Sequence, residues 1–161
     1  MSLKSNTGAS EVEEDAHIER IWPTLSTLDE FLEKYLDHSQ RYDFAKPFVE
    51  GKQIADIACG AGYGSYLLAD VAKSVTGFDV ADDALRHARQ HFSRDNVEFR
   101  HASTIGVDEF DVVISFETLE HMDEKDGDDF LVMLQALNYL KSSTNFMLST
   151  IGITLTFNTG L

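Results

Sequence analysis

Residues 54–64 decide the fold, and they read Ile-Ala-Asp-Ile-Ala-Cys-Gly-Ala-Gly-Tyr-Gly. The apolar residues around Asp56 predict a buried strand. The alternating glycines predict a tight turn, because glycine adopts positive φ and lets a ligand approach the main chain closely. A helix is expected to follow from Ser65 to about Lys73. Strand, glycine turn and helix in this order form the opening of a nucleotide-binding βαβ unit.

The spacing of the glycines argues against one class of cofactor, the nicotinamide dinucleotides. Dinucleotide-dependent oxidoreductases favour G-x-G-x-x-G, which would put a glycine at position 65, where the sequence has Ser65. Here the third glycine is Gly64, and Asp56 stands a short step before the turn. An NAD-type oxidoreductase is therefore disfavoured, and the chain shows no second catalytic domain for such an enzyme.

A second acidic residue, Asp79, ends the next apolar run. It follows Gly60 by 19 residues, which in a βαβ unit places the end of the second strand beside the glycine turn. An ionised carboxylate offers acceptors to both hydroxyls of a ribose. Dinucleotide enzymes use the same arrangement. Asp79 therefore predicts a cofactor that contains a nucleoside, but by itself it does not exclude a dinucleotide.

Residues 110–121 supply a third segment, Phe-Asp-Val-Val-Ile-Ser-Phe-Glu-Thr-Leu-Glu-His. In this order the three segments resemble motifs of the class I S-adenosylmethionine (SAM)-dependent methyltransferases, and the resemblance covers about residues 41–150. It implies SAM as the cofactor. It also implies an α/β fold, Rossmann-like and doubly wound, with a mainly parallel sheet.

The end of the chain departs from the complete family fold, which has seven strands and closes with an antiparallel hairpin. Only residues 151–161 follow the strand expected at 145–150. We therefore expect a core that lacks the usual C-terminal strands, as in a C-terminally truncated domain. Residues 153–157 alternate apolar and polar side chains and predict one more strand. Either this strand pairs with 145–150, or the exposed sheet edge forms a homodimer with a second chain.

The resemblance also assigns binding residues. Ser103 stands where relatives often carry an Asp that accepts a bond from adenine, and the Thr104 N–H is expected to serve the adenine ring. Glu117 is expected near the methionine end of SAM. The full predicted set is Tyr42, Asp56, Ala58, Cys59, Gly60, Gly62, Asp79, Val80, Ser103, Thr104 and Glu117.

The chemistry of methyl transfer needs little from the protein beyond alignment of donor and acceptor and exclusion of water. A general base helps when the acceptor is a hydroxyl. His121 is the predicted base, because it follows the fourth strand at the sheet edge where ligands bind in open α/β folds. Glu117, Glu120 and His121 are spaced i, i+3 and i+4, which on a helix places all three side chains on one face. The pattern resembles the metal motif of ubiquinone-pathway O-methyltransferases, but metal-free relatives also carry Leu-Glu-His. No metal is predicted.

Two functions from different classes remain open. The first is a SAM-dependent methyltransferase acting on a small-molecule acceptor, at a hydroxyl. The second is a SAM-binding, catalytically incomplete fragment or regulatory module. Residues 39–45 and 51–64 resemble bacterial methyltransferases of sugar and cell-surface glycan pathways.

The amino-acid composition limits which classes of binding partner and which cellular compartment are expected. The chain has 161 residues, with 13 Lys and Arg against 28 Asp and Glu, for a formal charge of −15. This charge disfavours nucleic acid and anionic membranes as partners. The single cysteine, Cys59, excludes an internal disulfide and suits the cytoplasm.

The organisation along the chain follows from composition and helical spacing. Residues 1–16 are polar and acidic and are predicted to be a disordered tail. Residues 17–161 are predicted to form one domain, with N-terminal helices in 17–50, a cofactor-binding core in 51–150 and a short tail in 151–161. Helical spacing runs from Leu28 to Val49, with a predicted interruption at 37–39 and Ser39 as the cap of the second helix.

Overall fold

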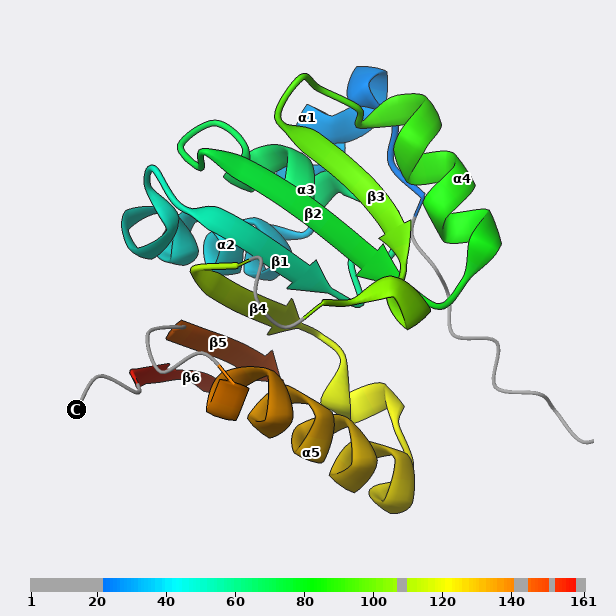
Figure 1. Ribbon diagram of the computed structural model, residues 1–161. Helices are drawn as coiled ribbons and strands as arrows, with labels where there is room; N and C mark the ends of the chain where they lie inside the picture. The colour runs from blue at the N-terminus through cyan, green and yellow to red at the C-terminus, as the bar shows by residue number, and fades with distance from the viewer. Residues whose placement is uncertain (1–21, 107–109, 141–144, 151–152, 159–161) are drawn as a thin grey trace, which may run out of the picture.

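A computed structural model describes residues 22–106, 110–140, 145–150 and 153–158. Within these residues the sheet has six strands in the order β3-β2-β1-β4-β5-β6 (Figure 1). All neighbours pair in parallel except β5 and β6. The strands are β1 (Gln53–Ile57), β2 (Ser74–Asp79), β3 (Val97–His101), β4 (Val112–Phe116), β5 (Asn145–Thr150) and β6 (Ile153–Asn158). The predicted α/β class with a mainly parallel sheet is confirmed.

Helices cover both faces of the sheet, as a doubly wound fold requires. The helices are α1 (Leu28–Lys34), α2 (Leu36–Val49), α3 (Tyr63–Leu68), α4 (Asp82–His91) and α5 (Glu124–Leu140), with short 3₁₀ turns η1 (Leu25–Thr27), η2 (Ala102–Thr104) and η3 (Leu119–His121). Helices α1 to α4 pack on one face and α5 lies on the other (Figure 1).

Four of the five residues of the central strand β1, Ile54 to Ile57, are buried. The strand has parallel neighbours on both sides and helices on both faces, which shield these residues from water. Ile54 packs with the helices of the α1 to α4 face, whereas Ala55 and Ile57 pack with Leu134 of α5. Asp56 is the one charged residue of β1, and it is buried.

Three predicted element boundaries were wrong. Helix α3 begins at Tyr63 and ends at Leu68, five residues before Lys73, because the chain turns at 69–71 to start β2 at Ser74. The interruption between the N-terminal helices lies at Tyr35, whose φ of −118° and ψ of 63° leave the helical region. Ser39 is therefore inside α2, and its hydroxyl donates to the Leu36 carbonyl instead of capping a helix.

The strand expected beyond β5 is present as β6, which folds back on β5 in an antiparallel hairpin. The register runs from Asn145 opposite Asn158 to Thr150 opposite Ile153. Of the two outcomes predicted for this edge, the structure shows the intramolecular one. The homodimer expected through a bare β5 edge has no free edge there, because β6 occupies it. The predicted tail at 1–16 lies outside the described residues, and the domain limits at 17 and 161 remain predictions.

Deleting residues 153–158 should expose the edge of β5. Unpaired N–H and C=O groups along an edge strand pair readily with another chain, so we expect the deleted protein to self-associate. Light scattering after size-exclusion chromatography measures this directly. A stable monomer with unchanged thermal unfolding would show that β6 does not protect the edge.

Candidate functional site

A cavity of about 210 Å³ lies at the carboxyl ends of β1, β2 and β4. It is the place where ligands bind in open α/β sheets, because the loops after the parallel strands converge there. Of the predicted site residues, those that line the cavity are Tyr42, Ala58, Cys59, Gly60, Asp79, Glu117 and His121.

The turn after β1 is built from left-handed backbone at Ala58, Gly60 and Gly62, with φ of 62°, 53° and 87°. A Cβ on Gly62 would collide with Ala88 of α4 and with the Phe99 ring of β3. Gly62 does not line the cavity; it is needed so that α4 and β3 can pack against the turn.

The third glycine, Gly64, has a different neighbour. A Cβ at this position would overlap the ring of Tyr42, which reaches α3 from α2. The Tyr42 ring packs edge-on against Tyr63 and Phe116, with centroids 5.7 and 5.3 Å away. The G-x-G-x-G spacing therefore also makes room for the N-terminal helices to close one side of the cavity.

Asp79 fastens the glycine turn to the end of β2. Its Oδ2 accepts the Gly60 N–H at 2.8 Å, and its Oδ1 accepts the Ala81 N–H at 2.9 Å. Each carboxylate oxygen keeps a further lone pair, and the side chain lines the cavity. Asp79 can thus hold the turn and accept ligand hydroxyls at the same time.

Asp56 lies beneath the turn instead of in the cavity. It is 1% exposed, and its Oδ2 accepts a 2.6 Å hydrogen bond from the Ser65 hydroxyl. Burial raises the pKa of Asp56 to about 7, with a further rise from the Asp79 charge, against the lowering effect of the Ser65 bond.

Three other predicted contacts also fall outside the residues that line the cavity. Val80 is 73% exposed at the start of the loop after β2. Ser103 and Thr104 form the exposed turn η2, where the Ser103 hydroxyl lies 2.8 Å from His101 Nδ1 and the Thr104 hydroxyl donates to the His101 carbonyl. Their predicted contacts with adenine stay predictions.

Charged side chains also line the cavity, at Arg41 and Glu117. Arg41 Nη2 lies 2.8 Å from Glu117 Oε1, an ion pair without hydrogen-bond alignment. Arg41 Nη1 and both carboxylate oxygens of Glu120 are buried, and none of them has a hydrogen-bond partner among the described residues. Burial raises the pKa of Glu117, the Arg41 charge opposes this, and the neighbouring Glu120 raises it further.

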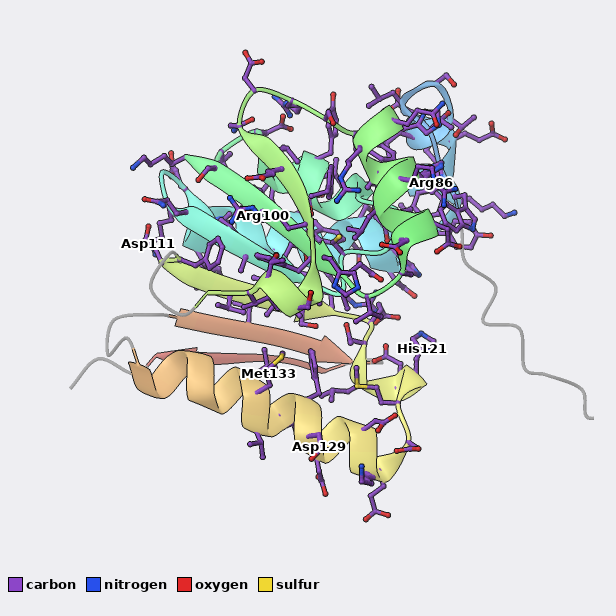
Figure 2. The ribbon with its side chains drawn as sticks, turned by 45° about the vertical axis from the view of Figure 1, so that its right-hand side comes forward. Arg86, Arg100, Asp111, His121, Asp129 and Met133 are labelled. Atoms are coloured by element: carbon purple, nitrogen blue, oxygen red, sulfur yellow. The ribbon has the colours of Figure 1, made fainter. Side chains whose placement is uncertain are left out.

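The expected helical alignment of Glu117, Glu120 and His121 was wrong. Glu117 has a φ of 54° and precedes the short turn η3, so the three side chains do not share one face of an α-helix. No group of three or more His, Cys, Asp and Glu suited to a metal ion occurs in the described ranges. Figure 2 shows His121 on the turn beyond the carboxyl end of β4, next to the start of α5.

Sequence reasoning did not assign several residues that line the cavity, namely Trp22, Phe31, His38, Ala61, Tyr63, Ala84 and Phe116. Of these, His38 bears on chemistry, because its Nδ1 lies 3.0 Å from the Tyr63 hydroxyl. Burial and the Arg41 charge lower its pKa. The available signal was its position three residues before Arg41, which places both on one side of a helix.

A family model described as a methyltransferase domain matches residues 54–140. The chain belongs to the class I SAM-dependent methyltransferases. SAM is the cofactor of this family, and the cavity fits it: Asp79 has acceptors for a ribose diol, and the unpartnered Arg41 Nη1 suits a carboxylate.

Relatives of this methyltransferase chain include O-methyltransferases of ubiquinone biosynthesis. The mitochondrial enzyme of Schizosaccharomyces pombe is 37% identical over 135 residues, which is 75% of this chain and 48% of that one. The enzyme of Hydrogenovibrio crunogenus is 38% identical over 92 residues, 51% of this chain and 38% of that one. The chain thus spans about half or less of the length of these relatives.

Solved structures support the same fold. Magnesium protoporphyrin IX methyltransferase from Synechocystis with bound SAM has a TM-score of 0.56 at 19% identity, covering 78% of this chain and 70% of that one. A protein of Pyrococcus horikoshii has a TM-score of 0.57 at 24% identity, covering 76% and 58%.

Replacing Asp79 with Ala should weaken SAM binding by roughly 1–3 kcal/mol. The ribose hydroxyls lose their acceptor, and the Gly60 N–H loses its hydrogen-bond partner. Asp111→Ala is the matched control. Asp111 also accepts a backbone N–H, from Gln53, but at the opposite end of the sheet (Figure 2). Calorimetry should show a loss of affinity for Asp79→Ala alone. Equal SAM affinity in both folded variants would show that Asp79 does not serve the cofactor.

Asp56 makes folding sensitive to pH. Its carboxyl holds a proton more tightly in the folded chain than in the unfolded chain. The carboxyl therefore makes its full contribution to the free energy of unfolding below the pKa that it has in the unfolded chain, and this contribution is lost as pH rises through about 7. The expected loss is on the order of 4 kcal/mol. Asp56→Asn keeps an acceptor for Ser65 and should remove this slope in urea unfolding between pH 4 and pH 8. The exposed Asp95→Asn serves as the control, and a slope that persists in Asp56→Asn would contradict the assignment.

Proposed function

We propose that this chain binds SAM and transfers its methyl group to a hydroxyl of a small molecule. The main observation that supports this proposal is that the glycine turn, Asp79 and the Arg41–Glu117 pair all line one cavity at the carboxyl ends of the parallel strands. When bound, SAM supplies an activated methyl group on a sulfonium. The residues of the chain hold the two reactants in line and keep water out.

Each part of the cavity has a role in this proposal. Asp79 accepts the ribose hydroxyls while the left-handed turn at Gly60 presents its backbone to the nucleoside. Arg41 receives the carboxylate of the amino-acid portion, and the Glu117 carboxylate faces its ammonium group. The aromatic side chains of Tyr42 and Phe116 exclude water from one side.

Two histidines line the cavity and are candidates for the base that takes the proton of the acceptor hydroxyl. His121 is the one predicted from the sequence; it is exposed and lies on η3. His38 is half-buried and bonded to Tyr63. Replacing the true base should lower kcat while leaving SAM affinity unchanged.

The acceptor class is supported by charge and by the relatives. A formal charge of −15 disfavours nucleic acid, and relatives are O-methyltransferases by name. No helix in the described residues is long and apolar enough to cross a membrane. A cytoplasmic setting fits the single, buried Cys59.

Titration calorimetry with SAM, and separately with NAD, tests the first half of the proposal. Methyl-labelled SAM with a panel of hydroxylated small molecules tests the second. Binding of SAM and transfer of label are expected. Binding without transfer to any acceptor would favour a SAM-binding module, and preference for NAD would overturn both.

Methyl transfer should not depend on a metal ion. Glu117, Glu120 and His121 do not form a metal cluster in the described structure, so activity should survive excess EDTA within about twofold. Loss of activity that Mg²⁺ restores would show that these residues act as ligands.

A further inference from the structure

Trp22 is a large aromatic side chain that lines the cofactor cavity at the carboxyl ends of β1, β2 and β4 and remains 38% exposed. Its ring and the ring of His87 lie 4.9 Å apart, centroid to centroid, and their planes are nearly perpendicular, at 78°. In such a pair the edge of one ring meets the face of the other. His87 therefore covers at most one face of the indole, and this contact leaves another face uncovered on a side chain that borders the cavity.

The segment that carries Trp22 is held against α4. Pro23 is buried, and its carbonyl accepts a 2.7 Å hydrogen bond from Nε2 of His87. A carbonyl oxygen only accepts, so Nε2 carries the proton in this contact. The His87 ring packs against His91 and Phe92, with centroids 4.4 and 6.2 Å away. Figure 1 shows this segment, at the blue start of the described chain, next to α4. Trp22 is thus fixed beside the cavity before a ligand binds.

The order of the strands determines which end of the cavity Trp22 borders. In the sheet, β2 lies on one side of β1 and β4 lies on the other. Glu117 follows β4 and pairs with Arg41, so this ion pair lies on the β4 side. Asp79 ends β2, and α4, against which Trp22 is held, comes next along the chain. Ala84 of α4 also lines the cavity. Trp22 therefore lies on the β2 side.

The covalent structure of SAM matches this arrangement. Adenine and the amino-acid portion are attached to one ribose, on either side of its two hydroxyls. In the proposed function Asp79 binds these hydroxyls, and Arg41 and Glu117 bind the amino-acid portion. The adenine ring then extends from Asp79 toward the β2 side, where the indole of Trp22 borders the cavity. The turn η2, predicted from the sequence to contact adenine, follows β3, the next strand on that side.

We propose that the adenine ring of the cofactor stacks on the indole of Trp22, and that His87 positions the indole through its hydrogen bond to the Pro23 carbonyl. This inference rests on the proposed function, because it needs SAM in the cavity. Aromatic side chains stack on nucleobases because every base has a π-face. Trp22 therefore contributes to the affinity for the nucleoside end of the cofactor. His87 is a positioning residue, and it acts on the ligand only through Trp22.

Two ligands separate the ends of the cofactor in titration calorimetry. S-adenosylhomocysteine has both the nucleoside and the amino-acid end, whereas 5′-methylthioadenosine has only the nucleoside. Trp22→Ala should weaken the binding of both ligands about tenfold, because each loses a stacking contact, and Trp22→Phe should stay within about threefold of the wild type. Leu25→Ala is the matched control, because Leu25 is also exposed near the start of the described chain but does not line the cavity. Arg41→Met should weaken S-adenosylhomocysteine only.

The outcomes separate the inference from the proposed function. If the wild type fails to bind S-adenosylhomocysteine, the proposed function is wrong and the inference is wrong with it. If the wild type binds that ligand, three results overturn the inference alone: no binding of 5′-methylthioadenosine, unchanged affinity of Trp22→Ala for both ligands, or a loss in Trp22→Ala that is confined to S-adenosylhomocysteine. Trp22→Leu, which is apolar but not aromatic, repeats the test if Trp22→Ala does not fold.

A double-mutant cycle with 5′-methylthioadenosine tests the role of His87. His87→Ala should weaken binding about fivefold in the wild type and should change nothing in Trp22→Ala, because His87 acts through the indole. His87→Gln keeps a side-chain N–H for the Pro23 carbonyl and should recover most of the lost affinity. Gln90→Ala, at an exposed position of α4 outside the cavity, is the control. No loss in His87→Ala, or an equal loss in both backgrounds, would overturn the positioning role.

Discussion

The fold and the site both depend on one carboxylate. Asp79 receives the N–H groups of Gly60 and Ala81 on its two oxygens. It thereby ties the end of β2 to the turn that leaves β1, across strands that are already paired in register from Gln53 to Ile57. Hydrogen bonds from backbone N–H groups to a charged acceptor are among the stronger ones in proteins. Because the same side chain lines the cavity, the geometry of the turn is fixed before any ligand arrives.

The position of the N-terminal helices depends on the glycine turn. Gly64 has no side chain at the point where the Tyr42 ring crosses α3, and that contact sets how close α2 can come to the sheet. Tyr42, Arg41 and His38 all belong to α2, so the position of this helix determines the aromatic wall, the ion pair with Glu117 and the place of His38 in the lining of the cavity. A segment outside the βαβ core thus controls half of the site.

The core of the fold could be predicted from the sequence because its signals are local. Buried apolar runs, glycines and strand-ending acids mark β1, β2 and β4 directly, and the two residues with the clearest signal, Gly60 and Asp79, do meet in space. The N-terminal wall could not be predicted in the same way. The position of α2 depends on contacts between residues far apart in the sequence, such as His38 with Tyr63 and Tyr42 with Phe116, which no short-range pattern encodes.

Binding roles assigned by analogy depend on contacts that the motifs do not encode, and those of Ser103 and Thr104 stay predictions. Asp56 has the expected position after a run of apolar residues, but the fold encloses it with Ser65 under the turn. Ser103 and Thr104 interact with His101 instead of lining the cavity. A motif fixes where the backbone goes, whereas the direction of each side chain depends on neighbours from other elements.

The location of Trp22 has a consequence for how this protein can be observed. It is the only tryptophan of the chain, it lines the cofactor cavity, and its ring meets His87 edge-on at 4.9 Å while remaining 38% exposed. A ligand that enters the cavity displaces water from the indole. The intrinsic fluorescence of the unmodified chain therefore reports the occupancy of one defined place in the molecule, and it does so without a label.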